Sequence, residues 1–173
     1  DVARYERVWV KDSSDFNHPA RLSRYSLNMK SGAVSLQTIA PQRIEFPQIN
    51  RNKWGRPYRY GYSLEIDIAG NGSNRYETAR GIYKLDLLSG DAQHLSVDEG
   101  LIPGEPFFVP SGDGQGNEDD GYLLSYVYSS ATHSSSLWIL DAHDISKVLA
   151  KIELVVRVPQ GFHGLWLSME SIV

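Results

Sequence analysis

The stretch LSRYSLNMKSGAVSLQTI, Leu22–Ile39, indicates the fold class of this 173-residue chain. Apolar and aromatic residues alternate with polar ones on both sides of a central KSG, and a period of two is typical of β-strands. Gly32 stands where a tight turn needs a positive φ, which glycine adopts without steric cost. We therefore expect two antiparallel strands joined by a turn.

The same pattern recurs twice further along the chain. The run GIYKLDLLSGDAQHLSV, Gly81–Val97, has LSG at its centre, and SLWILDAHDISKVLAKIEL, Ser136–Leu154, is a looser copy. Aligned on their aromatic residues, the hairpins are spaced 58 residues apart from Tyr25 to Tyr83 and 55 apart from Tyr83 to Trp138. A recurring unit of this length indicates a repeat architecture.

Further strand candidates lie between the hairpins, at Tyr58–Ile68 and Gly121–Ser129. A unit of about four strands that repeats is typical of the blades of a β-propeller. We therefore predict an all-β chain with about three blades. Three blades do not close a ring, and the first residue is not methionine. We expect residues 1–173 to be the C-terminal portion of a longer single-domain propeller, whose N-terminal part is missing here.

Composition excludes several classes of protein. The formal net charge is −4 and the basic residues are dispersed, so no nucleic-acid partner is expected. The chain has no cysteine, which excludes disulfides, thiolate metal sites and cysteine nucleophiles. No run of residues predicts a signal peptide or a transmembrane segment.

One loop, PSGDGQGNEDD at Pro110–Asp120, is rich in Gly, Asp and Asn, and we expect it to be exposed to solvent. A calcium site is a minor alternative there. The loop lacks the spaced carboxylates and the distant glutamate that an EF-hand requires.

Three ionisable residues follow the three hairpins in register. Glu45 lies in RIEFPQIN, Glu105 in IPGEPFFVP and His163 in RVPQGFHGLW, at spacings of 60 and 58 residues. Equivalent positions of successive blades surround one axis, so these side chains are candidates for a metal site or a coupled electrostatic cluster. The alternative is that they are edge or loop residues whose shared spacing reflects only the common ancestry of the blades.

Six motifs in order resemble the C-terminal part of the carotenoid cleavage oxygenases, a family that includes the apocarotenoid oxygenases, the lignostilbene dioxygenases and the retinal pigment epithelium retinoid isomerase. The motifs are EFPQIN, GRPYRYGYS, GEPFFVP, EDDGYLLSYVYS, LWILDA and RVPQGFHGLW. The resemblance runs from about Leu22 to Trp166. It implies a seven-bladed propeller with a non-haem Fe(2+) that four histidines hold and glutamates orient.

The resemblance assigns roles to the three residues in register. His163 matches the last iron ligand, and Glu45 and Glu105 match glutamates that orient ligand histidines. The other three ligands are expected upstream of Asp1, so this chain alone is expected to be inactive. We expect a Glu105 oxygen within about 2.6–3.2 Å of a His163 ring nitrogen. The remaining histidines match no motif and are expected at the surface: His18, His94, His133 and His143.

The implied reaction is cleavage of a conjugated carbon–carbon double bond by O2, giving two carbonyl products. The implied substrate is an apolar carotenoid, apocarotenoid or stilbene, and Phe46, Phe107 and Phe162 are candidates to line its cavity or to fill the core between blades. The resemblance also implies a soluble or peripheral protein of the cytoplasm or a plastid, with possible membrane contact. Three alternatives stay open: a non-catalytic binding propeller, a retinoid isomerase, and a glycosidase that uses Glu45 and Glu105.

Overall fold

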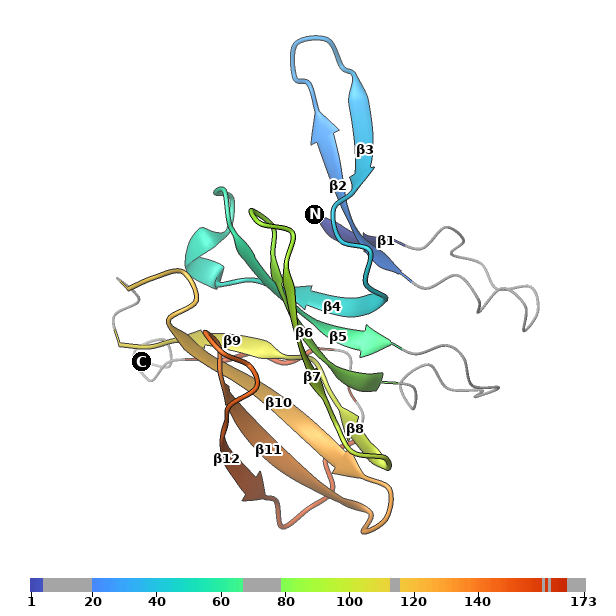
Figure 1. Cartoon of the computed structure of the whole chain (residues 1–173), viewed down its shortest axis with the longest axis vertical. Coiled ribbons are helices and arrows are strands. Elements are labelled where there is room, and N and C mark those ends of the chain that lie inside the picture. The colour runs from blue at the N-terminus through green and yellow to red at the C-terminus, as the bar shows by residue number, and fades with distance from the viewer. Residues whose placement is uncertain (5–19, 67–78, 113–115, 160, 162, 168–173) are drawn as a thin grey trace, which may run out of the picture.

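The computed structural model describes residues 1–4, 20–66, 79–112, 116–159, 161 and 163–167. Within these ranges the chain is all-β, and its strands form three antiparallel sheets with one short 3-10 turn (Figure 1). The three sheets follow one another along the sequence, which confirms the prediction of an all-β chain with about three blades. No helix in the described ranges has the length and apolarity needed to cross a membrane.

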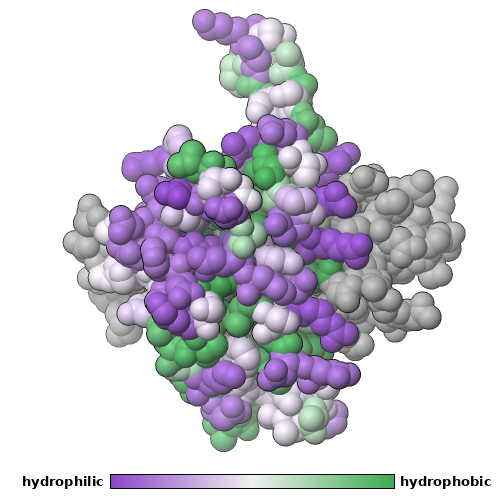
Figure 2. Space-filling view, in the orientation of Figure 1, coloured by the Kyte–Doolittle hydropathy of each residue, from purple (hydrophilic) through white to green (hydrophobic). Residues whose placement is uncertain are grey.

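The first sheet contains β1 (Val2–Arg4), β2 (Arg21–Leu27) and β3 (Val34–Thr38). The predicted hairpin is present, and Gly32 turns it with a φ of 72°. The hairpin projects away from the other two sheets (Figure 1), and Figure 2 shows apolar side chains interspersed with polar ones along it. Met29 near its tip is exposed, whereas Leu22 at its base is buried, so the hairpin joins the core only at its base.

The second sheet has the strand order β4-β5-β6-β7. Its strands are β4 (Ile44–Gln48), β5 (Tyr60–Ile66), β6 (Ala79–Asp86) and β7 (Ala92–Ser96), with the 3-10 turn η2 (Arg51–Lys53) between the first two. The predicted second hairpin is the β6–β7 pair, in which Gly90 has a φ of 84°.

The third sheet is built around β10 (Gly121–Ser129), which pairs with β11 (Ser134–Asp141), and β11 pairs with β12 (Val148–Glu153). On its other side β10 pairs with two short strands, β8 (Leu101–Pro103) and β9 (Phe107–Pro110). The first strand of this sheet is therefore interrupted, and the interruption contains Glu105.

The main core lies between the second and third sheets. Tyr62, Leu64 and Ile82 of the second sheet belong to one buried cluster with Leu123 and Val127 of β10. Shape-filling aliphatic and aromatic contacts of this kind supply most of the free energy that holds packed sheets together. This shared core fixes where residues between the two sheets lie.

The acidic loop between β9 and β10 is used differently from the expectation. Asp119 is only 2% exposed, so the expectation of a solvent-exposed loop is wrong at this position. Its carboxylate accepts a hydrogen bond from Lys84 Nζ of β6 at 2.5 Å, and Glu118 Oε1 accepts the backbone N–H groups of Arg59 and Tyr60 at 2.7 Å each. A buried carboxylate needs such partners. These two carboxylates therefore tie the third sheet to the second.

Candidate metal-ligand site and apolar pocket

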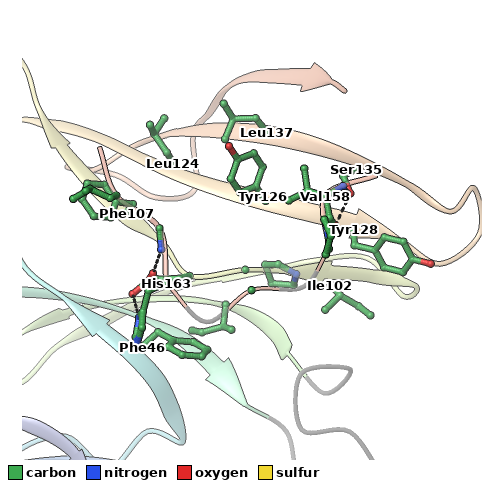
Figure 3. Close-up of a pocket in the computed structure, with 18 of the residues that line it drawn as sticks. Phe46, Ile102, Phe107, Leu124, Tyr126, Tyr128, Ser135, Leu137, Val158 and His163 are labelled. Carbon is green, nitrogen blue, oxygen red and sulfur yellow. Dashed lines mark hydrogen bonds and ion pairs between the residues drawn. The ribbon is translucent and has the colours of Figure 1, made fainter. Parts of the chain in front are cut away.

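An apolar pocket of about 310 Å³ lies between the second sheet, the third sheet and the C-terminal segment. Its walls are aliphatic side chains from both sheets and the C-terminal segment (Figure 3). They belong to Leu64 of β5, Ile102 of β8, Leu124 of β10, Leu137 of β11 and Val158. Pockets with this lining favour apolar ligands, with a few polar groups to orient them. His163 is the basic side chain of the lining and Glu105 the acidic one.

His163 and Glu105 form a hydrogen-bonded pair at the pocket. His163 Nδ1 lies 3.2 Å from Glu105 Oε1, at the upper end of the range expected from the sequence, so the predicted contact is present. A carboxylate oxygen accepts, so Nδ1 is the nitrogen that carries the proton. The lone pair of Nε2 then remains for a ligand-binding role. A histidine that binds a metal through Nε2 uses this tautomer.

The pair differs sharply in burial. The Glu105 side chain is 5% exposed, whereas the His163 side chain is 72% exposed. The Glu105 carboxylate is hydrogen-bonded at both oxygens, because Gly164 N donates to Oε2 at 2.7 Å and Gln48 Nε2 donates to Oε1. Glu105 is therefore buried and held by two other donors, whereas the His163 ring that it bonds is mostly exposed.

The sequence GEP explains how Glu105 reaches this position. Pro103 of β8 pairs with Val127, and Phe107 of β9 pairs with Leu124, so the first strand has one more residue than β10 across the interruption. Gly104 N donates to Tyr126 O at 2.7 Å, which keeps the interrupted backbone attached to β10. An extra residue of this kind bends a strand and redirects a side chain.

The C-terminal segment returns to the pocket because β11 holds it. Ser135 of β11 accepts the N–H of Val158 through its hydroxyl at 3.0 Å and the N–H of Leu154 through its carbonyl at 3.0 Å. These two bonds anchor the segment between β12 and His163.

The strand β4 also contains an extra residue next to its glutamate. Glu45 pairs with Leu64 and Gln48 pairs with Tyr62, so three steps along β4 match two steps along β5. Phe46, inside this bulge, has a φ of 51°. Residues opposite one another in an antiparallel pair share a face of the sheet. The bulge therefore places Gln48 on the same face as Glu45, whereas the strict alternation of a strand would separate them.

The structure sorts the expected site residues as follows. Phe46 lines the pocket and packs edge-on against the His163 ring at a centroid distance of 5.4 Å, and Phe107 also lines the pocket. Phe162 lies outside the described residues. Glu45 is partly buried on β4, but the residue of EFPQIN that reaches the Glu105 carboxylate is Gln48. The role of Glu45 toward another histidine stays a prediction.

Gln48 is the site residue that the sequence reasoning missed. Its only signal was its place three residues after Glu45, a spacing that points to the wrong face unless the strand contains a bulge. The predicted surface position of three other histidines is confirmed, since His94, His133 and His143 are all exposed. His18 lies outside the described residues.

The described part of the chain holds no group of three or more His, Asp or Glu side chains placed to bind a metal ion. What the site offers is a single imidazole, oriented by a buried carboxylate, beside an apolar pocket. Neutral imidazole suits Fe(II), and a carboxylate behind it fixes the ring and raises its basicity. The donor chemistry therefore fits one position of a metal centre.

Comparison with known proteins places this geometry in a family. Residues 2–168 match the model of the retinal pigment epithelial membrane protein family, RPE65. A carotenoid cleavage oxygenase of Mycobacterium tuberculosis is 33% identical over 171 residues, which cover 96% of this chain and 33% of that protein. An apocarotenoid-15,15'-oxygenase of Synechocystis is 35% identical over 157 residues, which cover 89% of this chain and 31% of that protein.

A solved structure of the cobalt-substituted Synechocystis apocarotenoid oxygenase superimposes with a TM-score of 0.77 at 34% identity, over 88% of this chain and 31% of that one. The Synechocystis enzyme is a seven-bladed propeller, and the three sheets described above correspond to part of it. The chain spans about a third of the length of the relatives it matches. By its family match, its relatives and its fold, the chain belongs to the RPE65 family of carotenoid cleavage oxygenases.

Proposed function

We propose that the whole protein is a non-haem Fe(II) dioxygenase that cleaves a conjugated carbon–carbon double bond of a carotenoid, apocarotenoid or stilbene with O2, giving two carbonyl products. The observation that carries the proposal is the His163–Glu105 pair beside the apolar pocket. The names of the relatives support it, since they are a carotenoid cleavage oxygenase and an apocarotenoid oxygenase. A cobalt-substituted form of the second relative supports a metal centre.

In this proposal His163 holds the metal through Nε2, and Glu105 holds His163. Glu45 orients a second histidine, and the three further histidine ligands belong to the rest of the protein. Bound iron supplies the activation of O2. This chain supplies the ligand orientation, and it excludes water from the substrate with an apolar wall.

The pocket lining supports the proposed substrate class. A polyene has no strong hydrogen-bonding groups along its chain, so its binding rests on burial of apolar surface at about 25 cal/mol per Å². Phe46 and Phe107 offer ring faces or edges to a conjugated chain, and Leu124 and Leu137 offer aliphatic contact. A pocket of this kind selects by length and shape.

The glycosidase alternative is less well supported by this geometry. A glycosidase needs one carboxylate that donates a proton or attacks the sugar from a partly solvated position. Glu105 is buried, and its oxygens accept hydrogen bonds from three donors, His163, Gly164 and Gln48. This carboxylate is placed to orient a histidine.

The test is iron content and product analysis of the full-length protein and two histidine variants. We expect His163→Ala to lose most of the bound iron and the cleavage activity. The control is His94→Ala, which removes an exposed histidine on β7 and should keep both. Products formed from a carotenoid, an apocarotenoid and a stilbene under 18O2 should carry the label in their carbonyl groups.

Metal-free protein with full activity, or iron and activity that survive His163→Ala, would overturn the proposal. A geometric isomer formed without consumption of O2 would instead assign the protein to the isomerases of the family. Iron binding without any turnover of these substrates would favour a non-catalytic role.

A further inference from the structure

The Glu105 carboxylate is held by an amide from a different sheet. Gln48 Nε2, at the end of β4, donates to Glu105 Oε1, which is the same oxygen that lies 3.2 Å from His163 Nδ1. Gln48 and Glu105 are separated by 57 residues in sequence and belong to neighbouring sheets. The contact therefore joins the second and third sheets directly behind the histidine.

Because the Glu105 side chain is buried, its carboxylate depends on the hydrogen bond from Gln48. With a side chain only 5% exposed, the Glu105 carboxylate has little water to satisfy it and relies on protein donors. Gly164 N donates to Oε2 and Gln48 Nε2 donates to Oε1, so these two donors together fix the rotation of the carboxylate, whose two oxygens turn as one planar group. The position of Oε1 in turn sets the plane and the tilt of the His163 ring.

The bulge in β4 brings the side chains of Phe46 and Gln48 to the His163–Glu105 pair. Phe46 lies in the left-handed region with a φ of 51°, a conformation that costs energy in a residue other than glycine and that persists where the surrounding structure requires it. Its ring meets the His163 ring edge-on at an interplanar angle of 88°, while the next residue but one, Gln48, bonds the carboxylate. The strained backbone thus places one side chain against the imidazole and another against the carboxylate that bonds it.

We propose that Gln48 is a positioning residue for the metal site: its amide locks the rotation of the Glu105 carboxylate and so aims Nε2 of His163. The proposal rests on the proposed function, in which His163 is a metal ligand. Gln48 touches neither metal nor substrate and acts only through Glu105. Because the amide is neutral, it orients the carboxylate without changing the net charge of the site.

The expected effect is smaller than that of losing Glu105. Replacing a residue that bonds a ligand histidine costs about 10–100-fold in metal affinity. Gln48 stands one hydrogen bond further out, so Gln48→Met, which keeps the length and removes the donor, should weaken Co(II) binding about 3–10-fold. The ligand-field bands of the Co(II) form should also shift or broaden, because the imidazole is no longer held at one angle.

The experiment is a Co(II) titration of the full-length apoprotein against a competing chelator, with visible spectra and thermal midpoints of each variant. The matched control is Gln93→Met, which removes another hydrogen-bonded glutamine, on β7, that bonds His143 O and Ile145 N. It should keep the parental affinity and spectrum. If Gln48→Met does not fold, Gln48→Leu, which is also neutral and has no amide donor, carries the same expectation.

Parental Co(II) affinity and spectrum in a folded Gln48 variant would overturn the proposal, even if the thermal midpoint falls, since a purely structural contact would change stability alone. The unaltered protein and His163→Ala, titrated in parallel, separate this failure from failure of the proposed function. If the unaltered protein binds no Co(II), or if His163→Ala binds it equally well, the metal site itself is wrong.

Discussion

The buried ion pair between Lys84 and Asp119 should be a main support of the contact between the second and third sheets. The Lys84 side chain is 4% exposed and the Asp119 side chain 3%, and Nζ lies 2.5 Å from Oδ2. Lys84 Nζ also donates to His143 O at 2.9 Å and lies 4.3 Å from the centre of the Tyr60 ring. Lys84→Met removes all three interactions and leaves a buried carboxylate without its closest cation.

Breaking one side of a buried pair costs about 3–5 kcal/mol, whereas replacing both sides with apolar residues of similar volume is often neutral. We expect Lys84→Met and Asp119→Leu each to lower the free energy of unfolding by about 3–5 kcal/mol. The double variant should recover most of that loss. Lys151→Met is the matched control, because Lys151 Nζ lies over the Trp138 ring at 3.8 Å from an exposed position, and its loss should cost about 0.5–1 kcal/mol.

The assay is denaturant unfolding of the full-length protein, followed by circular dichroism and tryptophan fluorescence. Single variants whose free energy of unfolding lies within about 1 kcal/mol of the parent, the scale of an ordinary substitution, would refute the reasoning. So would a double variant whose loss of stability is the sum of the two single losses. Either result would mean that the pair is screened by solvent, despite its burial in the structure.

The same pair predicts a pH dependence. Burial raises the pKa of the Asp119 carboxyl, but the hydrogen bond and charge of Lys84, with His143, lower it by more, so the net pKa lies below the ordinary value. A group with a depressed folded-state pKa stabilises fully above its unfolded-state pKa, about 3.9 for Asp, and loses that stabilisation as the pH falls through the folded-state pKa. We expect the parent to lose stability below about pH 4, and Lys84→Met to lose less over that window, as measured by urea unfolding at stepwise lower pH.

Two further substitutions test the packing and the pocket. Gly81→Ala should destabilise the second sheet by about 1–3 kcal/mol, because a Cβ at this position would lie 2.4 Å from Leu95 O. Gly61→Ala is the control and should be tolerated, because its Cβ would lie 3.9 Å from Gln48 O. Equal thermal midpoints for the two variants would contradict this prediction. Leu137→Trp should narrow the pocket and lower kcat/KM for a long carotenoid more than for a short stilbene. The iron content should stay at the parental value. An unchanged ratio of the two kcat/KM values would show that the pocket does not hold the substrate.

Local pattern accounts for the parts of the structure that could be predicted. Alternation of apolar and polar residues marked the strands, and Gly32 and Gly90, both at positive φ, marked two of the turns. The repeat spacing then placed Glu105 and His163 in register on neighbouring repeats. The resemblance to the carotenoid cleavage oxygenases added the expectation of a hydrogen bond between them, and that bond is present in the structure at 3.2 Å.

What could not be predicted depends on groups that are distant in sequence. The burial of Asp119 depends on Lys84, 35 residues away, so a loop rich in Gly and Asp looked like an exposed one. Likewise the break between β8 and β9 is visible only against their shared partner β10. Composition describes a segment in isolation, and neither effect arises within one segment.

The sequence alone determines the all-β class and the repeat of about three blades, because both rest on the periodicity of the residues. The pairing of His163 with Glu105 was predicted from the resemblance to the carotenoid cleavage oxygenases, which assigned the two residues their roles. The approach of Gln48 to Glu105 is a matter of tertiary structure. It requires one extra residue in β4, which moves the side chains that follow to the other face of the sheet. Whether β4 accommodates an extra residue depends on its pairing with β5 and on the space beside His163. Neither can be inferred from the six residues of EFPQIN.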